Sequence, residues 1–257
     1  MYPFKTLPFF IATALFFIAC TKQESQEDLD EATCTNIRNL TITSNSPVTV
    51  GQQIKFSAPE VGGYRTYLWN GPNHFQEQYP DHVIDYAELK HEGWYYLAVA
   101  NNTCETKIDS VYIDVKLQQG TPSCNIAANS TSYSNLSNDA YSNASKRIES
   151  TYSLLSLEGW GNGNITVYFH PQWRTKEPED GIYSTTNVPL FDQADDNYNK
   201  VFISTVKSNI YWGCYENQQV CVSHIAGKLQ VRFCNLDMGG NNGTSFTTKA
   251  SGNIIEL

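Results

Sequence analysis

Acidic residues are the first candidates for chemistry in this sequence. Glu177, Glu179 and Asp180 lie close together, and a pair of carboxylates is what glycoside hydrolases use to cleave their substrates. The three residues surround Pro178 and precede Gly181, a composition typical of a solvated turn. We therefore interpret this group as a turn and expect no catalytic residue in it.

A second acidic group could hold a metal ion. Asp192, Asp195 and Asp196, followed by Asn197, provide the hard oxygen ligands that calcium prefers. Their spacing differs from that of an EF-hand loop. Calcium at these residues is therefore a weak alternative, and our expectation is that the chain holds no metal and no cofactor.

Nucleophiles and bases do not form a recognisable pair. No serine or cysteine lies in a motif that would activate it, and His170 and His224 have no visible partner in the sequence. Gly159, Gly161 and Gly163 precede a predicted strand, whereas a dinucleotide-binding glycine loop precedes a helix. The sequence favours a protein that is not an enzyme.

Aromatic side chains suggest a different kind of site, because their flat apolar faces can stack on sugar rings. Packing inside a sheet would explain most of them equally well. The candidate glycan-contact residues are Trp160, Trp173, Tyr183, Tyr211 and Trp212.

The elements that would position these residues are short strands. Between residues 33 and 118, apolar and polar residues alternate in runs separated by turn residues, at the spacing of a β-sandwich. The predicted strands of this first domain are 37–43, 53–57, 64–69, 83–86, 94–100 and 107–116.

The region 122–257 shows the same alternation and predicts a second antiparallel sandwich or partly closed sheet. Residues 125–145 are rich in Ser and Asn and predict an irregular lead-in, and 237–243 predicts a glycine-rich loop. We expect the strands 209–215 and 220–225 to form a hairpin. The other predicted strands are 152–160, 165–170, 182–185, 200–206, 228–234 and 245–256.

Composition agrees with an all-β protein and excludes some partners. The chain has 257 residues, 16 of them Tyr and 16 Gly, and only 17% are charged. The net charge of −9 becomes −10 when Lys5 is removed. A chain this acidic without a basic stripe is a poor ligand for nucleic acid.

The first twenty residues indicate export. Lys5 is followed by the apolar stretch 7–18, which has the length of a signal-peptide core and is too short to span a bilayer. The run Phe17-Ile18-Ala19-Cys20 resembles the lipobox of bacterial lipoproteins. That resemblance implies a signal peptide over 1–19, acylation of Cys20 and a lasting anchor in the outer membrane.

The segment 20–32 is acidic and predicts a flexible tether. Its residues Ser25-Gln26-Glu27-Asp28 resemble the export signal of Bacteroidetes surface lipoproteins, which implies that the protein faces the cell exterior. A plain soluble spacer, with the protein facing the periplasm, is the alternative.

Six cysteines follow Cys20, and an even number in an exported chain predicts disulfides. Many pairings are possible, and the sequence alone does not choose among them. A zinc site at Cys214, Cys221, His224 and Cys234 is the alternative, but this spacing matches no familiar zinc pattern. The pairs we favour are Cys34–Cys104, Cys124–Cys234 and Cys214–Cys221.

Two segments of the first domain resemble immunoglobulin-like or PKD-like modules of bacterial surface proteins. Tyr67-Leu68-Trp69 resembles the central strand whose Trp fills the core, and Gly93-Trp94-Tyr95-Tyr96-Leu97 resembles the start of strand F with its tyrosine corner. Leu97 stands where antibody domains have a cysteine. We expect Trp69 and Trp94 to lie in the core.

The second domain resembles the uncharacterised β-rich C-terminal domains of Bacteroidetes lipoproteins, a likeness that implies no activity. Together these features predict a membrane-anchored surface lipoprotein that acts as a non-enzymatic binding or adhesion module. We expect the second domain to make the contact, with a glycan or another envelope protein. A glycan-capture lipoprotein, an extracellular hydrolase and a structural subunit of an envelope complex are the alternatives.

Overall fold

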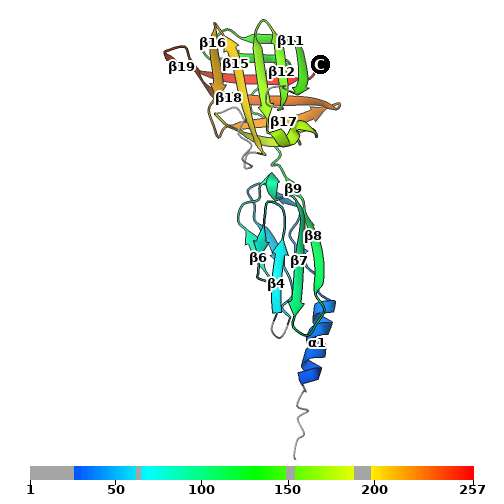
Figure 1. Ribbon diagram of the computed structural model, residues 1–257. Helices are drawn as coiled ribbons and strands as arrows, with labels where there is room; N and C mark the ends of the chain where they lie inside the picture. The colour runs from blue at the N-terminus through cyan, green and yellow to red at the C-terminus, as the bar shows by residue number, and fades with distance from the viewer. Residues whose placement is uncertain (1–25, 62–64, 149–153, 188–197) are drawn as a thin grey trace, which may run out of the picture.

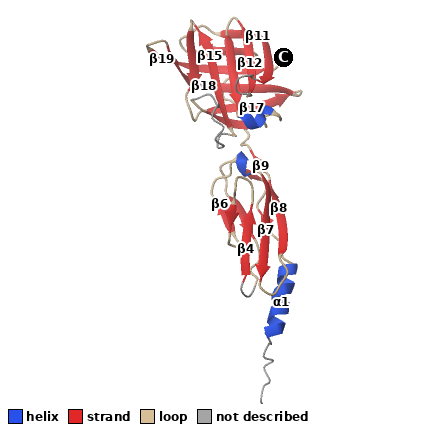
Figure 2. Cartoon of the chain, in the orientation of Figure 1, coloured by secondary structure: helices blue, strands red, loops and turns tan. Residues whose placement is uncertain are grey.

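The computed structural model describes residues 26–61, 65–148, 154–187 and 198–257, and strands dominate them (Figures 1 and 2). The all-β prediction is confirmed. The strands fall into two groups along the chain, one between residues 43 and 116 and one between residues 130 and 255, and no described strand of one group pairs with a strand of the other. Cys20 and Asp192, Asp195 and Asp196 lie outside the described residues.

The predicted tether is wrong over its second half, because a helix begins inside it. Helix α1 (Gln26–Arg38) also replaces the start of the strand expected at 37–43. Ile37 is fully buried, Cys34 is bonded to Cys104, and Arg38 pairs with Glu31 at 3.0 Å. A covalent bond and a buried side chain in the last turns therefore hold this polar segment as a helix.

The first strand group forms two facing sheets and a short parallel pair. One sheet has the order β1-β3-β6, the other the order β5-β4-β7-β8, and β2 pairs with β9. The 3-10 helix η1 (Leu89–His91) precedes β7. The strands are β1 (Thr43–Ser44), β2 (Val48–Thr49), β3 (Ile54–Ser57), β4 (Arg65–Asn70), β5 (Gln76–Glu77), β6 (His82–Ile84), β7 (Gly93–Asn101), β8 (Lys107–Ile113) and β9 (Val115–Lys116).

The core between these sheets has the features of an immunoglobulin-like sandwich. Trp69 on β4 is fully buried, with its ring centroid 5.3 Å from that of Phe56. Tyr95 is also buried, and its hydroxyl donates to the carbonyl of His91 at 3.0 Å, which is a tyrosine corner. Leu97 fills the usual cysteine position. The immunoglobulin-like prediction is therefore confirmed.

The second strand group forms one sheet that closes on itself (Figure 1). Following the pairings from β13 through β12, β11, β10, β19, β18, β16 and β15 leads back to β13, and every pairing in this ring is antiparallel. Strands β14 and β17 add a second connection from β15 to β18. Because the ring is closed, each of its strands pairs with a neighbouring strand on both edges.

The bounds of these strands correct two sequence predictions. The expected lead-in 125–145 contains two strands, and the expected loop 237–243 is largely the end of β18, which runs through Gly239 and Gly240. The 3-10 helix η2 (Pro171–Arg174) follows β13. The strands are β10 (Ser130–Tyr133), β11 (Asp139–Ile148), β12 (Leu155–Gly161), β13 (Asn164–Phe169), β14 (Gly181–Thr185), β15 (Lys200–Lys207), β16 (Ile210–Cys214), β17 (Gln219–Ile225), β18 (Lys228–Asn241) and β19 (Ser245–Ile255).

Side chains fill the inside of the closed sheet. Leu157, Val167 and Ile203 are cross-strand partners, and all three are fully buried. A charged pair is buried as well: Lys207 Nζ lies 2.6 Å from Asp139 Oδ1, with both side chains almost inaccessible. The hydroxyl of Tyr133 donates to Asp139 Oδ2 at 3.3 Å, so the carboxylate has two partners. Such pairing is what makes a buried charge tolerable.

Two of the three expected disulfides are present, Cys34–Cys104 and Cys124–Cys234. The third is wrong, because Cys214 and Cys221 are free. The predicted hairpin between their strands does not exist. Instead β16 and β17 both pair with β18, where Cys214 faces Met238 and Cys221 faces Arg232. Six residues of strand separate these positions by about 20 Å, too far for a disulfide.

None of the helices among the described residues is long and apolar enough to cross a membrane.

The two free thiols should differ in reactivity. Burial raises the pKa of Cys214 to about 11, and Cys221 is only partly buried. We expect iodoacetamide to modify Cys221 slowly in the native protein and Cys214 only after unfolding, as read by peptide mass spectrometry without reduction. Failure of both to react in denaturant would mean that they are joined after all.

Candidate binding surfaces

The structure separates the five predicted glycan-contact aromatics into two groups. Trp160 and Tyr211 are exposed, at 45% and 51%. Trp173, Tyr183 and Trp212 are buried and belong to the core, so the prediction is wrong for them. The indole N–H of Trp173 donates to the carbonyl of Tyr198 at 2.9 Å, as expected of a core tryptophan.

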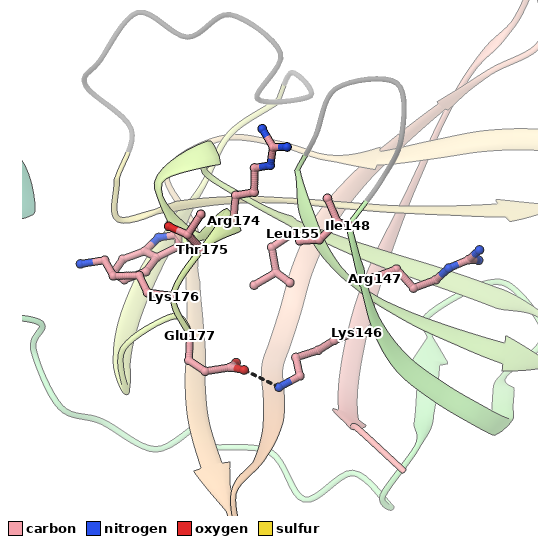
Figure 3. Close-up of a pocket in the computed structure, with 9 residues that line it drawn as sticks. Lys146, Arg147, Ile148, Leu155, Arg174, Thr175, Lys176 and Glu177 are labelled. Atoms are coloured by element: carbon pink, nitrogen blue, oxygen red, sulfur yellow. Dashed lines mark hydrogen bonds and ion pairs between the residues drawn. The ribbon is translucent and has the colours of Figure 1, made fainter.

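The acidic turn at 177–180 is tied into a network of ion pairs. Glu177 Oε1 lies 2.6 Å from Lys146 Nζ (Figure 3), and Lys146 also contacts Glu256 at 3.2 Å. His224, for which the sequence showed no partner, has Nδ1 2.6 Å from Asp180 Oδ1 and Nε2 3.7 Å from Glu177 Oε2. The network joins the turn to β11, to β17 and to the end of the chain.

The ion pair with Lys146 makes Glu177 unsuited to be the proton donor of a glycoside hydrolase. Such an acid has a raised pKa, whereas the hydrogen bond from Lys146 lowers the pKa of Glu177. The pKa of Glu179 is raised by its own burial and by Glu92. An adjoining cavity of about 350 Å³ is bordered by Lys146, Arg147, Leu155 and Glu177 (Figure 3). Lys146 holds Glu177 of this turn by an ion pair. The geometry of the turn therefore favours a structural role.

No group of three or more His, Cys, Asp or Glu side chains within the described ranges could hold a metal ion. The calcium prediction at Asp192, Asp195 and Asp196 lies outside those ranges.

Five exposed large apolar side chains lie together on the outer side of the sheet β5-β4-β7-β8. We call this surface the aromatic sheet face. Its members come from the central strands β4 and β7 and from β8, and their exposed fractions range from 36% to 62%. They are Leu68, Trp94, Tyr96, Ile108 and Tyr112.

Strand register places these side chains side by side. Trp94 is opposite Tyr112, with ring centroids 5.4 Å apart in an edge-on arrangement. Tyr96 follows on the same side of β7, between Asn70 and Ser110, and Ala98 comes next, between Leu68 and Ile108. Directly opposed side chains point to the same side of a sheet, so the five members form one continuous surface.

A hydrogen bond at the border of this face holds one ring in place. The hydroxyl of Tyr112 donates to Glu92 Oε1 at 3.0 Å. The pKa of Tyr112 is raised by partial burial and by that bond to Glu92, so its hydroxyl stays a donor. Leu68 and Ile108, at the end of the face away from Trp94, have no hydrogen-bonding group in their side chains. Tyr96, in the row between, is flanked by Asn70 and Ser110. The surface therefore suits a partner that is mainly apolar and carries some polar groups.

The exposure of Trp94 contradicts the prediction that it lies in the core. Side chains alternate along a strand, and Tyr95 and Leu97 take the inward positions of β7. Trp94 and Tyr96 must then point outward. The sequence already contained the signal for this exposure. If Tyr95 forms a tyrosine corner and points inward, its neighbours Trp94 and Tyr96 must point outward.

Comparisons with known proteins identify no family. No protein-family model matches the chain, and no curated protein does. Solved structures that resemble it include a mouse coronavirus receptor-binding domain complexed with its murine receptor, with a TM-score of 0.27 and 7% identity over 85% of this chain and 96% of that chain.

Two further solved structures are murine CEACAM1b and the immunoglobulin domains 1–5 of Sidekick-1. The first has a TM-score of 0.26 and 10% identity, covering 85% of this chain and 98% of that one. The second has a TM-score of 0.23 and 8% identity, covering 84% and 59%. TM-scores this low assign neither a family nor an activity to the chain.

Proposed function

We propose that this chain is a lipid-anchored protein-binding module that faces the cell exterior and contacts its partner through the aromatic sheet face. In this proposal residues 1–19 are a signal peptide, Cys20 carries the lipid, and residues 33–118 and 122–257 are two domains. The observation that carries the binding function is the continuous exposure of Leu68, Trp94, Tyr96, Ile108 and Tyr112 on one side of one sheet.

The partner is a protein with an apolar patch. Exposed apolar side chains gathered on one surface mark interaction sites, and Trp and Tyr are enriched among the residues that dominate protein interfaces. The aliphatic row of Leu68, Ala98 and Ile108 at one end of the face offers a sugar no hydrogen bond. It matches apolar side chains of another protein much better.

The position of α1 supports an anchor at the N-terminal end. In Figure 1, α1 lies at the end of the first strand group that is farthest from the closed sheet, and the bond between Cys34 and Cys104 ties it to the chain after β7. A lipid on Cys20 would place the membrane beyond this end. The aromatic sheet face would then stand between the membrane and the closed sheet, within reach of a neighbouring envelope protein.

The location is tested by adding protease to intact cells and probing for the closed sheet. We expect the wild-type chain to be cut on intact cells and the Cys20→Ala variant to be mislocalised. Protection of the wild-type chain until the outer membrane is opened would contradict the outward orientation.

The binding function is tested by chemical crosslinking on intact cells with the wild-type chain and three variants. Tyr96→Asp and Ile108→Asp should each lower the yield of the crosslinked complex at least about tenfold, because an unpaired charge is costly in an apolar interface. Tyr86→Asp is the matched control, since Tyr86 is an exposed tyrosine outside the face.

All three positions are exposed, so the variants should keep their folded circular-dichroism spectra. A complex that survives both face variants, or one that the control removes equally, would contradict the proposal.

A further inference from the structure

A second surface with different chemistry lies on the outer side of the closed sheet. Strands β16 and β18 run side by side there, and a groove of about 460 Å³ opens above them and reaches β19. We call it the tyrosine groove. Its main members are Tyr211, Gly213, Tyr215, Gly239, Asn241 and Ser245.

Side chains alternate between the two sides of the sheet along β16, and this decides which of them line the groove. Trp212 and Cys214 point inward and are buried, whereas Tyr211 and Tyr215 are exposed at 51% and 46%. Gly213 lies between the two tyrosines on the same side. Tyr211 and Trp212, two of the predicted glycan-contact residues, therefore point to opposite sides of the sheet.

Two glycines make the groove hollow. A Cβ atom on Gly239 would lie 2.7 Å from the hydroxyl oxygen of Tyr215, and one on Gly213 would lie 3.0 Å from Cζ of Phe202. Any larger residue would push these rings away from the sheet. The absence of side chains at both positions lets the aromatic rings lie close to the backbone and leaves open space between them.

The groove continues into a row of exposed apolar side chains. Tyr211 is opposite Val206 on β15, and the backbone N–H of Val206 donates to Asn164 Oδ1 at 2.8 Å. Asn164 in turn is opposite Trp160 on β12. Neighbouring strands lie about 5 Å apart, so Trp160 and Tyr211 stand on the same outer side about three strand spacings apart.

The chemistry of the groove is uncharged. None of the described residues that line it is acidic or basic; they are aromatic residues, glycines, amides, a serine and a cysteine. Ser204 is opposite Gly213, on the same side of the sheet as Tyr211. Aromatic rings beside amide groups provide both a stacking surface and hydrogen bonds, without charge, in a volume typical of ligand sites.

We propose that the tyrosine groove binds a neutral carbohydrate, with Tyr211 and Tyr215 stacking on sugar rings, Asn241 bonding hydroxyl groups and Trp160 extending the contact along the polymer. Charged polysaccharides fit poorly, because none of the lining residues within the described ranges carries a charge that would pair with their groups. This site is independent of the aromatic sheet face, which belongs to the other strand group.

The test is affinity electrophoresis of the full chain, purified in detergent, through native gels that contain one soluble polysaccharide each. The neutral probes are a β-glucan, a mannan, a xylan and a galactan, and polygalacturonate is the anionic probe. We expect retardation by at least one neutral polymer and none by polygalacturonate.

Variants then assign the binding to the groove. Tyr211→Ala and Tyr215→Ala should each weaken binding at least about tenfold, and Trp160→Ala should weaken it for polymers more than for a disaccharide competitor. Tyr86→Ala, an exposed tyrosine in the first strand group, should bind like the wild type. The two tyrosines of the groove are exposed, so circular dichroism should show folded variants.

Two outcomes would overturn the proposal. One is the absence of retardation by all four neutral polymers. The other is retardation that persists unchanged in both Tyr211→Ala and Tyr215→Ala. Neither outcome affects the protein-binding proposal, because the variants of the aromatic sheet face are measured on a different surface and by a different readout.

Discussion

The inward position of Tyr95 is the constraint on which the first strand group depends. Its ring packs 4.6 Å from that of Phe56, and its hydroxyl bonds to the carbonyl of His91. Because the period of a strand is two residues, a shift of one would turn every side chain of β7 to the other side. Burial of Tyr95 therefore presents Trp94 and Tyr96 to the outside, and it aligns β4 and β8 so that Leu68 and Ile108 stand beside them.

The same rule governs the closed sheet, with a different outcome. Trp212 and Cys214 of β16 point to the inside, and the residues that alternate with them, Tyr211, Gly213 and Tyr215, lie on the outside. The first strand group thus exposes the aromatic sheet face, and the second exposes the uncharged tyrosine groove. The buried Lys207–Asp139 pair holds β15 against β11 across the interior, so the two sides of the ring are joined by charge as well as by packing.

Local pattern predicted much of this structure. Strand positions, the buried Trp69 and the tyrosine corner followed from alternation and from the resemblance to immunoglobulin-like modules. Two of the three favoured disulfides are also present, although the sequence alone did not choose among the pairings. Pairing between distant strands did not follow: Cys214 and Cys221 are close in sequence, but β18 separates their strands by pairing with each at a different place. Neither the contact between His224 and Asp180 nor the tyrosine groove could be predicted, since both depend on pairing between strands that are not neighbours in the sequence. The helix at Gln26–Arg38 was missed because a disulfide and one buried isoleucine hold a segment that composition alone assigns to a tether.

Hydroxyl-radical footprinting of the anchored protein on intact cells, compared with the purified protein, is the most direct test of a covered aromatic sheet face. We expect Trp94 and Tyr96 to be oxidised in the purified protein and protected on cells. Tyr86 should be oxidised in both samples and the buried Trp69 in neither. Equal oxidation of Trp94 in the two samples would contradict the proposal that this face meets a partner.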